Sequence, residues 1–144
     1  MEQKIDEQNV SRRTAICALS LIGVGIFTSA ESAVAATGVK ILSNGKVQVT
    51  LKSNPALKKV GGVVRIDDVK GKSIALVRTS AKAYTAVNLL CTHLGGALFQ
   101  TGNQWQCDEH GATFTLAGKN LVGPATTALK QLPVKATASV VTIG

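Results

Sequence analysis

From Val47 onward the chain contains only short apolar segments, and no window after residue 40 keeps a helical period for three turns. Apolar positions within the segments often alternate, and β-branched residues are frequent. Turn-forming residues separate them, as at Asn44-Gly45, Gly61-Gly62 and Lys70-Gly71-Lys72. Such a pattern predicts an all-β fold, a small antiparallel sandwich or barrel, with strands within 47–51, 63–66, 74–76, 83–87, 129–134 and 140–143.

The N-terminal segment has a different composition, with the three parts of an export signal. A pair of arginines precedes an uncharged apolar run, and a small-x-small site follows; these are Arg12-Arg13, residues 15–30 and Ala33-Val34-Ala35. The arginine pair resembles the twin-arginine type of signal, which carries folded proteins. Residues 1–35 are therefore predicted to be a twin-arginine signal peptide, and residues 36–144 the folded domain.

The same segment has an alternative role as a membrane anchor. Residues 14–30 reach the short limit of a membrane-spanning helix, so an uncleaved signal would attach the protein to the membrane. In both cases the domain is expected outside the cytoplasm, in the periplasm or at the outer face of the cytoplasmic membrane.

The domain is strongly basic. The whole chain has a formal net charge of +8, and 13 basic against 4 acidic side chains follow residue 35. They form either an ordinary solvated surface or a field that attracts an acidic partner or anionic lipid. Nucleic acid is not an expected partner, because the protein is predicted to be exported, aromatic residues are few and no recognition motif is present.

The candidate site contains nearly all of the histidine and cysteine residues of the chain. Cys91, His93, Cys107 and His110 are every histidine of the chain and every cysteine outside the signal, which contains Cys17. The pattern is C-x-H, thirteen residues, C-x-x-H. Two thiolates and two imidazoles make a soft four-ligand site, suited to zinc or to iron–sulfur chemistry. A stand-alone catalyst is not expected, because no cysteine or histidine of the domain remains to act as a nucleophile or base.

These residues stand in motifs that resemble the Rieske iron–sulfur proteins. The motifs are the two boxes and the proline loop of that family, seen here as Cys91-Thr92-His93-Leu94-Gly95, Cys107-x-x-His110-Gly111 and Gly123-Pro124-Ala125. The resemblance implies a Rieske-type antiparallel β fold with a cluster-binding loop subdomain, and one [2Fe–2S] cluster per chain. It also implies that Cys91 and Cys107 bind one iron, and His93 and His110 the other. A zinc site is the alternative, although zinc sites usually pair cysteine with cysteine and histidine with histidine.

The sequence departs from the high-potential members of that family at four positions. Gly96 and Glu109 replace two cysteines that form a disulfide, and Ala112 and Phe114 replace a serine and a tyrosine whose hydroxyls donate to sulfur. Since such donors favour the reduced state, we expect a midpoint potential under about +200 mV within the family's range of about −150 to +300 mV. Asp108 and Glu109 are either solvated loop charges or groups that disfavour the reduced cluster.

The resemblance implies one-electron transfer in an oxidoreductase complex. The leading hypothesis is an extracytoplasmic Rieske subunit of a quinol-oxidising, cytochrome b-like respiratory complex, with a cytochrome c-type acceptor. The alternatives are the small subunit of an exported molybdoenzyme similar to arsenite oxidase, and a ferredoxin that serves an oxygenase.

Overall fold

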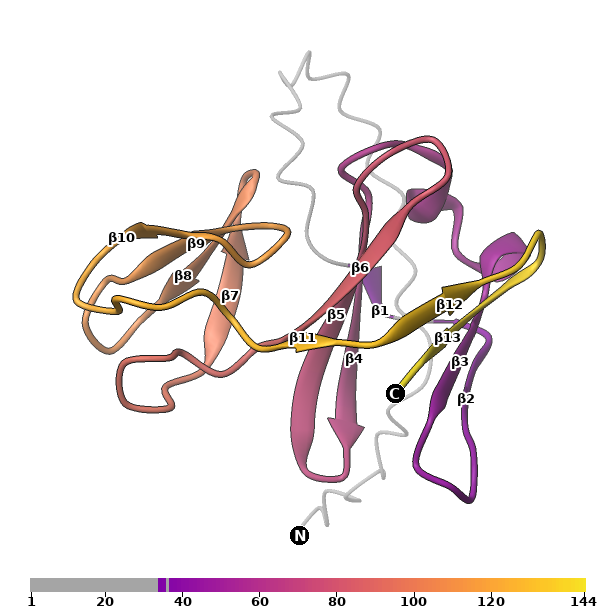
Figure 1. Ribbon diagram of the computed structural model, residues 1–144, viewed down its shortest axis with the longest axis horizontal. Coiled ribbons are helices and arrows are strands. Elements are labelled where there is room, and N and C mark those ends of the chain that lie inside the picture. Colours follow the sequence, from indigo (N-terminus) through magenta and orange to yellow (C-terminus); the bar gives the residue numbers. More distant parts are fainter. Residues whose placement is uncertain (1–33, 36) are drawn as a thin grey trace, which may run out of the picture.

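A computed structural model describes residues 34–35 and 37–144, which form three β-sheets and two short 3-10 helices (Figure 1). This confirms the predicted all-β class. The twin-arginine motif and the apolar segment 14–30 lie outside the described residues. None of the helices within the described residues is long and apolar enough to cross a membrane.

The central sheet has the strand order β1-β4-β5-β6-β11. Its strands are β1 (Val34–Ala35), β4 (Val63–Val69), β5 (Lys72–Arg78), β6 (Tyr84–Asn88) and β11 (Gln131–Leu132). All pairs are antiparallel except that of β1 with β4. The β4–β5 hairpin turns at Lys70 and Gly71, which both have positive φ, as tight hairpins require. Strand β1 comes from the end of the segment predicted to be the signal.

Two four-stranded sheets flank the central one (Figure 1). One has the order β10-β9-β8-β7 and consists of β7 (Leu98–Thr101), β8 (Gln104–Cys107), β9 (Thr113–Thr115) and β10 (Asn120–Val122). The other has the order β12-β13-β3-β2 and consists of β2 (Val39–Ile41), β3 (Val47–Thr50), β12 (Val134–Ala136) and β13 (Val140–Ile143). The 3-10 helices η1 (Leu51–Ser53) and η2 (Pro55–Lys58) connect β3 to β4.

Each face of the central sheet covers a separate core, because successive side chains of a strand point to opposite faces. Val63, Ala75 and Val87 face the β7–β10 sheet, with which they form the first core. Val64, Leu76 and Ala86 face the β2–β3–β12–β13 sheet and form the second core. Burial on both faces explains why residues 74–77 are all apolar rather than alternating.

The predicted strands differ from the structure at their ends: those predicted at 63–66 and 74–76 are longer, as β4 and β5, and that at 83–87 is shifted by one residue, as β6. Two further differences have a local cause. The strand predicted over residues 47–51 ends at Thr50, since the buried Asn54 donates from Nδ2 to the carbonyls of Thr37 (2.7 Å) and Thr50 (2.9 Å) and stabilises the turn there. The segment 129–134 is not one strand. Pro133 lacks an N–H, and the chain leaves the central sheet after β11 to join the outer sheet as β12.

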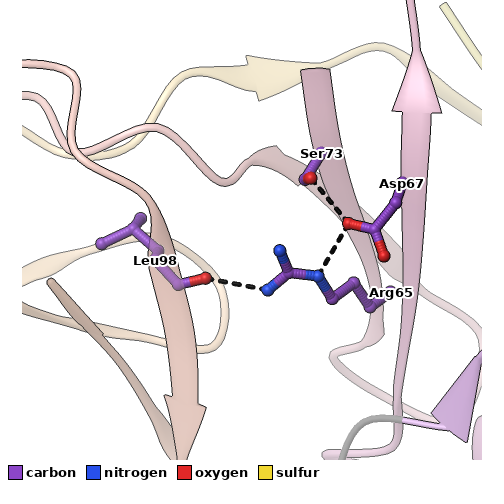
Figure 2. Close-up of polar contacts among 4 residues, drawn as sticks. All are labelled: Arg65, Asp67, Ser73 and Leu98. Atoms are coloured by element: carbon purple, nitrogen blue, oxygen red, sulfur yellow. Dashed lines mark hydrogen bonds and ion pairs between the residues drawn. The ribbon is translucent and has the colours of Figure 1, made fainter. Parts of the chain in front are cut away.

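A polar link joins the central sheet to the β7–β10 sheet (Figure 2). Arg65 of β4 donates from Nη1 to the carbonyl oxygen of Leu98 at 2.9 Å and from Nε to Asp67 Oδ1 at 2.8 Å. Ser73 donates its hydroxyl to the same carboxylate oxygen at 2.6 Å. These two donors lower the pKa of Asp67. The guanidinium also lies 5.7 Å from the ring centroid of Phe99, so Arg65 holds the beginning of β7 in place.

Candidate metal centre

The first loop of the site follows β6 and leads into β7. The N–H of Cys91 donates to the carbonyl of Gly96 at 2.8 Å, and the N–H of Gly95 donates back to the carbonyl of Cys91 at 2.9 Å. Leu90 and Ala97 form a β-bridge just outside this loop. Residues 91–96 are thus a closed loop whose two ends are held together.

The second loop, between β8 and β9, closes in the same way. The N–H of Cys107 donates to the carbonyl of Ala112 at 2.9 Å, and the N–H of Gly111 donates to the carbonyl of Cys107 at 3.0 Å. Gly95 and Gly111 occupy the same place in the two loops, and both have positive φ, of 81° and 74°. Such a backbone conformation favours glycine, which explains a glycine at the same offset from each cysteine.

Sheet register places the two loops side by side. Leu98, the first residue of β7, pairs with Cys107 at the end of β8. The imidazoles of His93 and His110 lie with ring centroids 5.0 Å apart and ring planes perpendicular. Both histidines are exposed, whereas Cys91 and Cys107 are only 4% and 1% exposed and belong to the first core. The predicted site residues therefore form a buried thiol pair and an exposed imidazole pair.

The surroundings of Cys91 change the ionisation of its thiol. Burial raises the pKa of Cys91, and the neighbouring Cys107 side chain raises it further, while the backbone N–H groups of His93 and Leu94 act in the opposite direction. A thiol must lose its proton to become a metal ligand, so metal binding here releases protons. The two inward N–H groups then remain as partners for negative charge on the Cys91 sulfur.

A third segment packs beside the first loop. The hydroxyl of Thr92 donates to the carbonyl of Thr127 at 2.8 Å. Ala125 is buried in the same core as Cys91 and Cys107. The segment following Gly123-Pro124 therefore lies against the loop that contains His93. Nothing in the sequence marked Thr127 as a contact of that loop.

Gly96 and Glu109, which stand where high-potential Rieske proteins have their disulfide cysteines, lie next to each other. A Cβ atom built on Gly96 would lie 2.8 Å from Cδ of Glu109 and 3.0 Å from Sγ of Cys107. Glycine at position 96 thus allows the two loops to approach without a covalent link. The other two substituted positions, Ala112 and Phe114, are fully buried in the first core and present no hydroxyl. Between them, the buried Thr113 Oγ1 has no hydrogen-bond partner within the described residues.

The donor set fits a two-iron centre. Within the described residues, no group of three or more His, Cys, Asp or Glu side chains is placed to hold a metal ion. The four candidate ligands occur instead as two like pairs, one of sulfur and one of nitrogen donors. Rieske centres divide their ligands in this way, with two histidines in place of two cysteines on one iron.

The chain belongs to the Rieske [2Fe-2S] family, since residues 47–133 match that domain. Membership of this family implies one [2Fe–2S] cluster per chain. Over 80 residues it is 35% identical to the cytochrome b6-f complex iron-sulfur subunit of Chlorobaculum thiosulfatiphilum, an alignment that covers 50% of this chain and 44% of that relative. The chain therefore spans less than half the length of this curated relative.

Solved structures agree with the fold. The plasma membrane Rieske protein PetC3 from Synechocystis PCC 6803 superposes with a TM-score of 0.51 and 27% identity, over 60% of this chain and 90% of that one. The Rieske monooxygenase CntA superposes with a TM-score of 0.53 and 20% identity, over 63% of this chain and 30% of that one. The second likeness concerns the fold alone.

Proposed function

We propose that Cys91 and Cys107 bind one iron of the cluster and that His93 and His110 bind the other. The observation that carries this proposal is the division of the four side chains into a buried thiol pair and an exposed imidazole pair. Both pairs come from two loops with the same backbone closure, so one site receives a cysteine and a histidine from each loop.

The residues around the site suit electron exchange with a partner protein. The cluster supplies a one-electron redox couple when bound. Cys91 and Cys107 hold their sulfurs in the core and away from water. His93 and His110 lie at the surface, where a partner can reach their imidazoles. Leu94, next to His93, is 70% exposed and offers an apolar contact for such a partner.

The protein is, in this proposal, an extracytoplasmic subunit of a quinol-oxidising, cytochrome b-like complex. The relative from the cytochrome b6-f complex supports this choice. The Arg12-Arg13 signal directs export of the folded domain, and residues 14–30 either anchor it or are removed. A cytochrome b subunit with its quinol is the donor, and a cytochrome c-type protein is the acceptor.

The ligand assignment is tested by magnetic resonance on the reduced full-length holoprotein labelled with ¹⁵N-histidine. The chain has only two histidines, so any histidine nitrogen coupled to the cluster comes from His93 or His110. We expect two coupled nitrogens in the wild type and one in any variant, His93→Cys or His110→Cys, that retains a cluster. Absence of nitrogen coupling, or one zinc and no acid-labile sulfide, would contradict the assignment.

The complex and the location need separate measurements. Membranes that contain the protein should reduce its cluster on addition of quinol, and an inhibitor of cytochrome b should block this. Reduction only by a molybdoenzyme substrate, or only by an oxygenase reductase, would support one of the alternatives instead. Replacing Arg12 and Arg13 by lysine should retain the protein in the cytoplasm; unchanged export would refute the twin-arginine assignment.

A further inference from the structure

A groove of about 730 Å³ lies at the end of the second core, away from the metal centre. It is formed by η1 and η2, by the turn between β5 and β6, and by the turn between β12 and β13. In Figure 1 these segments lie on the opposite side of the central sheet from β7–β10. No part of the proposed electron-transfer site lines this groove.

The groove is lined by cations and by no acidic residue. Lys52, Lys58, Arg78 and Lys82 all contribute to its wall. The four acidic residues that follow residue 35 lie elsewhere, namely Asp67 and Asp68 near the β4–β5 turn, and Asp108 and Glu109 beside Cys107. Within the described residues, the one ion pair is that of Arg65 with Asp67. The positive charge of the groove therefore has no carboxylate partner in the described part of the chain.

Arg78 fixes part of this charge in place. Its Nη1 donates to the carbonyls of Leu57 at 2.8 Å and Lys58 at 3.2 Å, and its Nε to that of Ser80 at 3.1 Å. Nη2 donates to the carbonyl of Ala81. The half-buried guanidinium also lies 5.6 Å from the ring centroid of Tyr84. Neutral carbonyls orient the guanidinium without cancelling its charge, so an anion in the groove meets a preorganised positive field.

The groove also has apolar walls. Leu57 is buried at its base and Leu51 is half-buried beside it, while the three lysines are exposed. Lysines can extend their ammonium groups toward a phosphate while their aliphatic stems cover apolar surface. An inorganic anion would use the cations alone, whereas a phosphate attached to an acyl glycerol would also contact the half-buried Leu51 and Tyr84. The combination favours an amphiphile with a phosphate head.

From this geometry we infer that the groove binds the headgroup of an anionic phospholipid. Lysine ammonium groups surround the phosphate, and Arg78 supplies the fixed positive field. Binding there holds the end of the domain formed by η1, η2 and the β12–β13 turn at the membrane surface. His93 and His110 stay free, because no residue of their loops lines the groove. This docking is independent of residues 14–30 and of the identity of the redox partner.

Lysine acylation footprinting on the full-length holoprotein tests this inference. Vesicles of phosphatidylglycerol mixed with phosphatidylcholine are compared with vesicles of phosphatidylcholine alone, so attachment through residues 14–30 is common to both. We expect the mixed vesicles to slow acylation of Lys52, Lys58 and Lys82 severalfold, because a bound headgroup covers these three ammonium groups. Lys40, Lys46 and Lys119, which are exposed on other segments, are the internal controls and should react equally in both.

A matched pair of variants gives an independent measurement. Titration of short-chain phosphatidylglycerol, below its micelle concentration, should show at least about tenfold weaker binding to K52Q/K58Q/K82Q than to the wild type, the loss expected from even one charge-assisted hydrogen bond. The control K40Q/K46Q/K119Q removes the same net charge and should bind nearly as the wild type does. Equal protection of all six lysines, or equal loss in both variants, would show a diffuse electrostatic attraction and overturn the inference. Protection of the groove lysines by inorganic phosphate at the same concentration would overturn the lipid assignment. Absence of protection by phosphatidylglycerol would overturn it as well, and is the result expected if the groove binds an acidic protein.

Discussion

The two faces of the central sheet carry cores of different character. The first core contains the aromatic side chains Trp105 and Phe114 and both site cysteines. The second core is made of valine, isoleucine, leucine and alanine alone among its fully buried members. One sheet therefore supports a reactive centre on one side and an inert aliphatic layer on the other.

The difference lies in what completes each core. The second core is closed by aliphatic side chains from hairpins that pair directly, as β3 does with β13. The first core ends at Cys91 and Cys107, the proposed thiolate ligands of the cluster, so its integrity depends on the loops around them. Variants on the two faces should thus separate stability from cluster binding.

The largest expected effect comes from a substitution in the first core. Cys107→Ser should abolish the native cluster, because a serine oxygen is a poor substitute for a soft thiolate on iron. Leu76→Ala, in the second core, is the matched control. It should lower the free energy of unfolding by about 2–5 kcal/mol and leave the iron content per folded protein unchanged. Iron and sulfide analysis, with denaturant unfolding, checks both; loss of iron from folded Leu76→Ala would remove the distinction between the faces.

The next effect tests the contact between the loops. Gly96→Cys with Glu109→Cys should form a disulfide, since a Cβ at position 96 reaches the Glu109 side chain. A link that closes a loop of this length stabilises by up to about 3 kcal/mol. Unfolding with and without reductant measures this. Gly96→Ala alone is the control: it adds the same Cβ beside Glu109 and Cys107 without the link, and should not be more stable than the wild type. A double variant whose thiols stay free under oxidising conditions would show that the loops are further apart.

A smaller effect concerns the polar link between the central sheet and the β7–β10 sheet, and it depends on pH. Hydrogen bonds from Ser73 and Arg65 lower the pKa of Asp67, so its contribution to stability is present above its ordinary value, near pH 4, and is lost as the pH falls through the lower folded-state pKa. The carboxylate is largely exposed, and we expect less than about 1 kcal/mol. Asp67→Asn should remove this acid dependence and Asp68→Asn should not. Thermal unfolding from pH 2 to 6 distinguishes them, and identical profiles for both variants would exclude the link.

The smallest expected effect is a shift in redox potential. Ala112→Ser and Phe114→Tyr each add a hydroxyl to the core that contains both cysteines, at the positions where high-potential Rieske proteins have their donors to sulfur. Each should raise the midpoint potential by tens of millivolts from a wild-type value below about +200 mV. Thr113→Val removes a hydroxyl that faces the other side of β9 and should leave the potential unchanged. Redox-poised EPR provides the values. A wild-type potential near +300 mV would mean that other groups set it.

Much of the fold and the candidate site could be predicted from local patterns. Alternating valines predicted β3, and Asn44-Gly45 and Lys70-Gly71 predicted turns, because strand faces and positive φ are properties of neighbouring residues. The Cys-x-His and Cys-x-x-His motifs identified the candidate ligands and the family, since a soft donor set can be recognised from residue type and spacing alone.

Only the tertiary structure decided which distant residues meet. The side chain of Arg65 donates a hydrogen bond to the carbonyl of Leu98, 33 residues away in sequence, and that of Thr92 donates one to the carbonyl of Thr127, 35 residues away. No short pattern encodes either contact, because a backbone carbonyl is an acceptor at every residue. The basic groove likewise joins lysines from η1, η2 and the β5–β6 turn, which appear scattered along the sequence. The sequence by itself determined the donors and the strand faces, whereas the packing of three sheets determined which of those groups face one another.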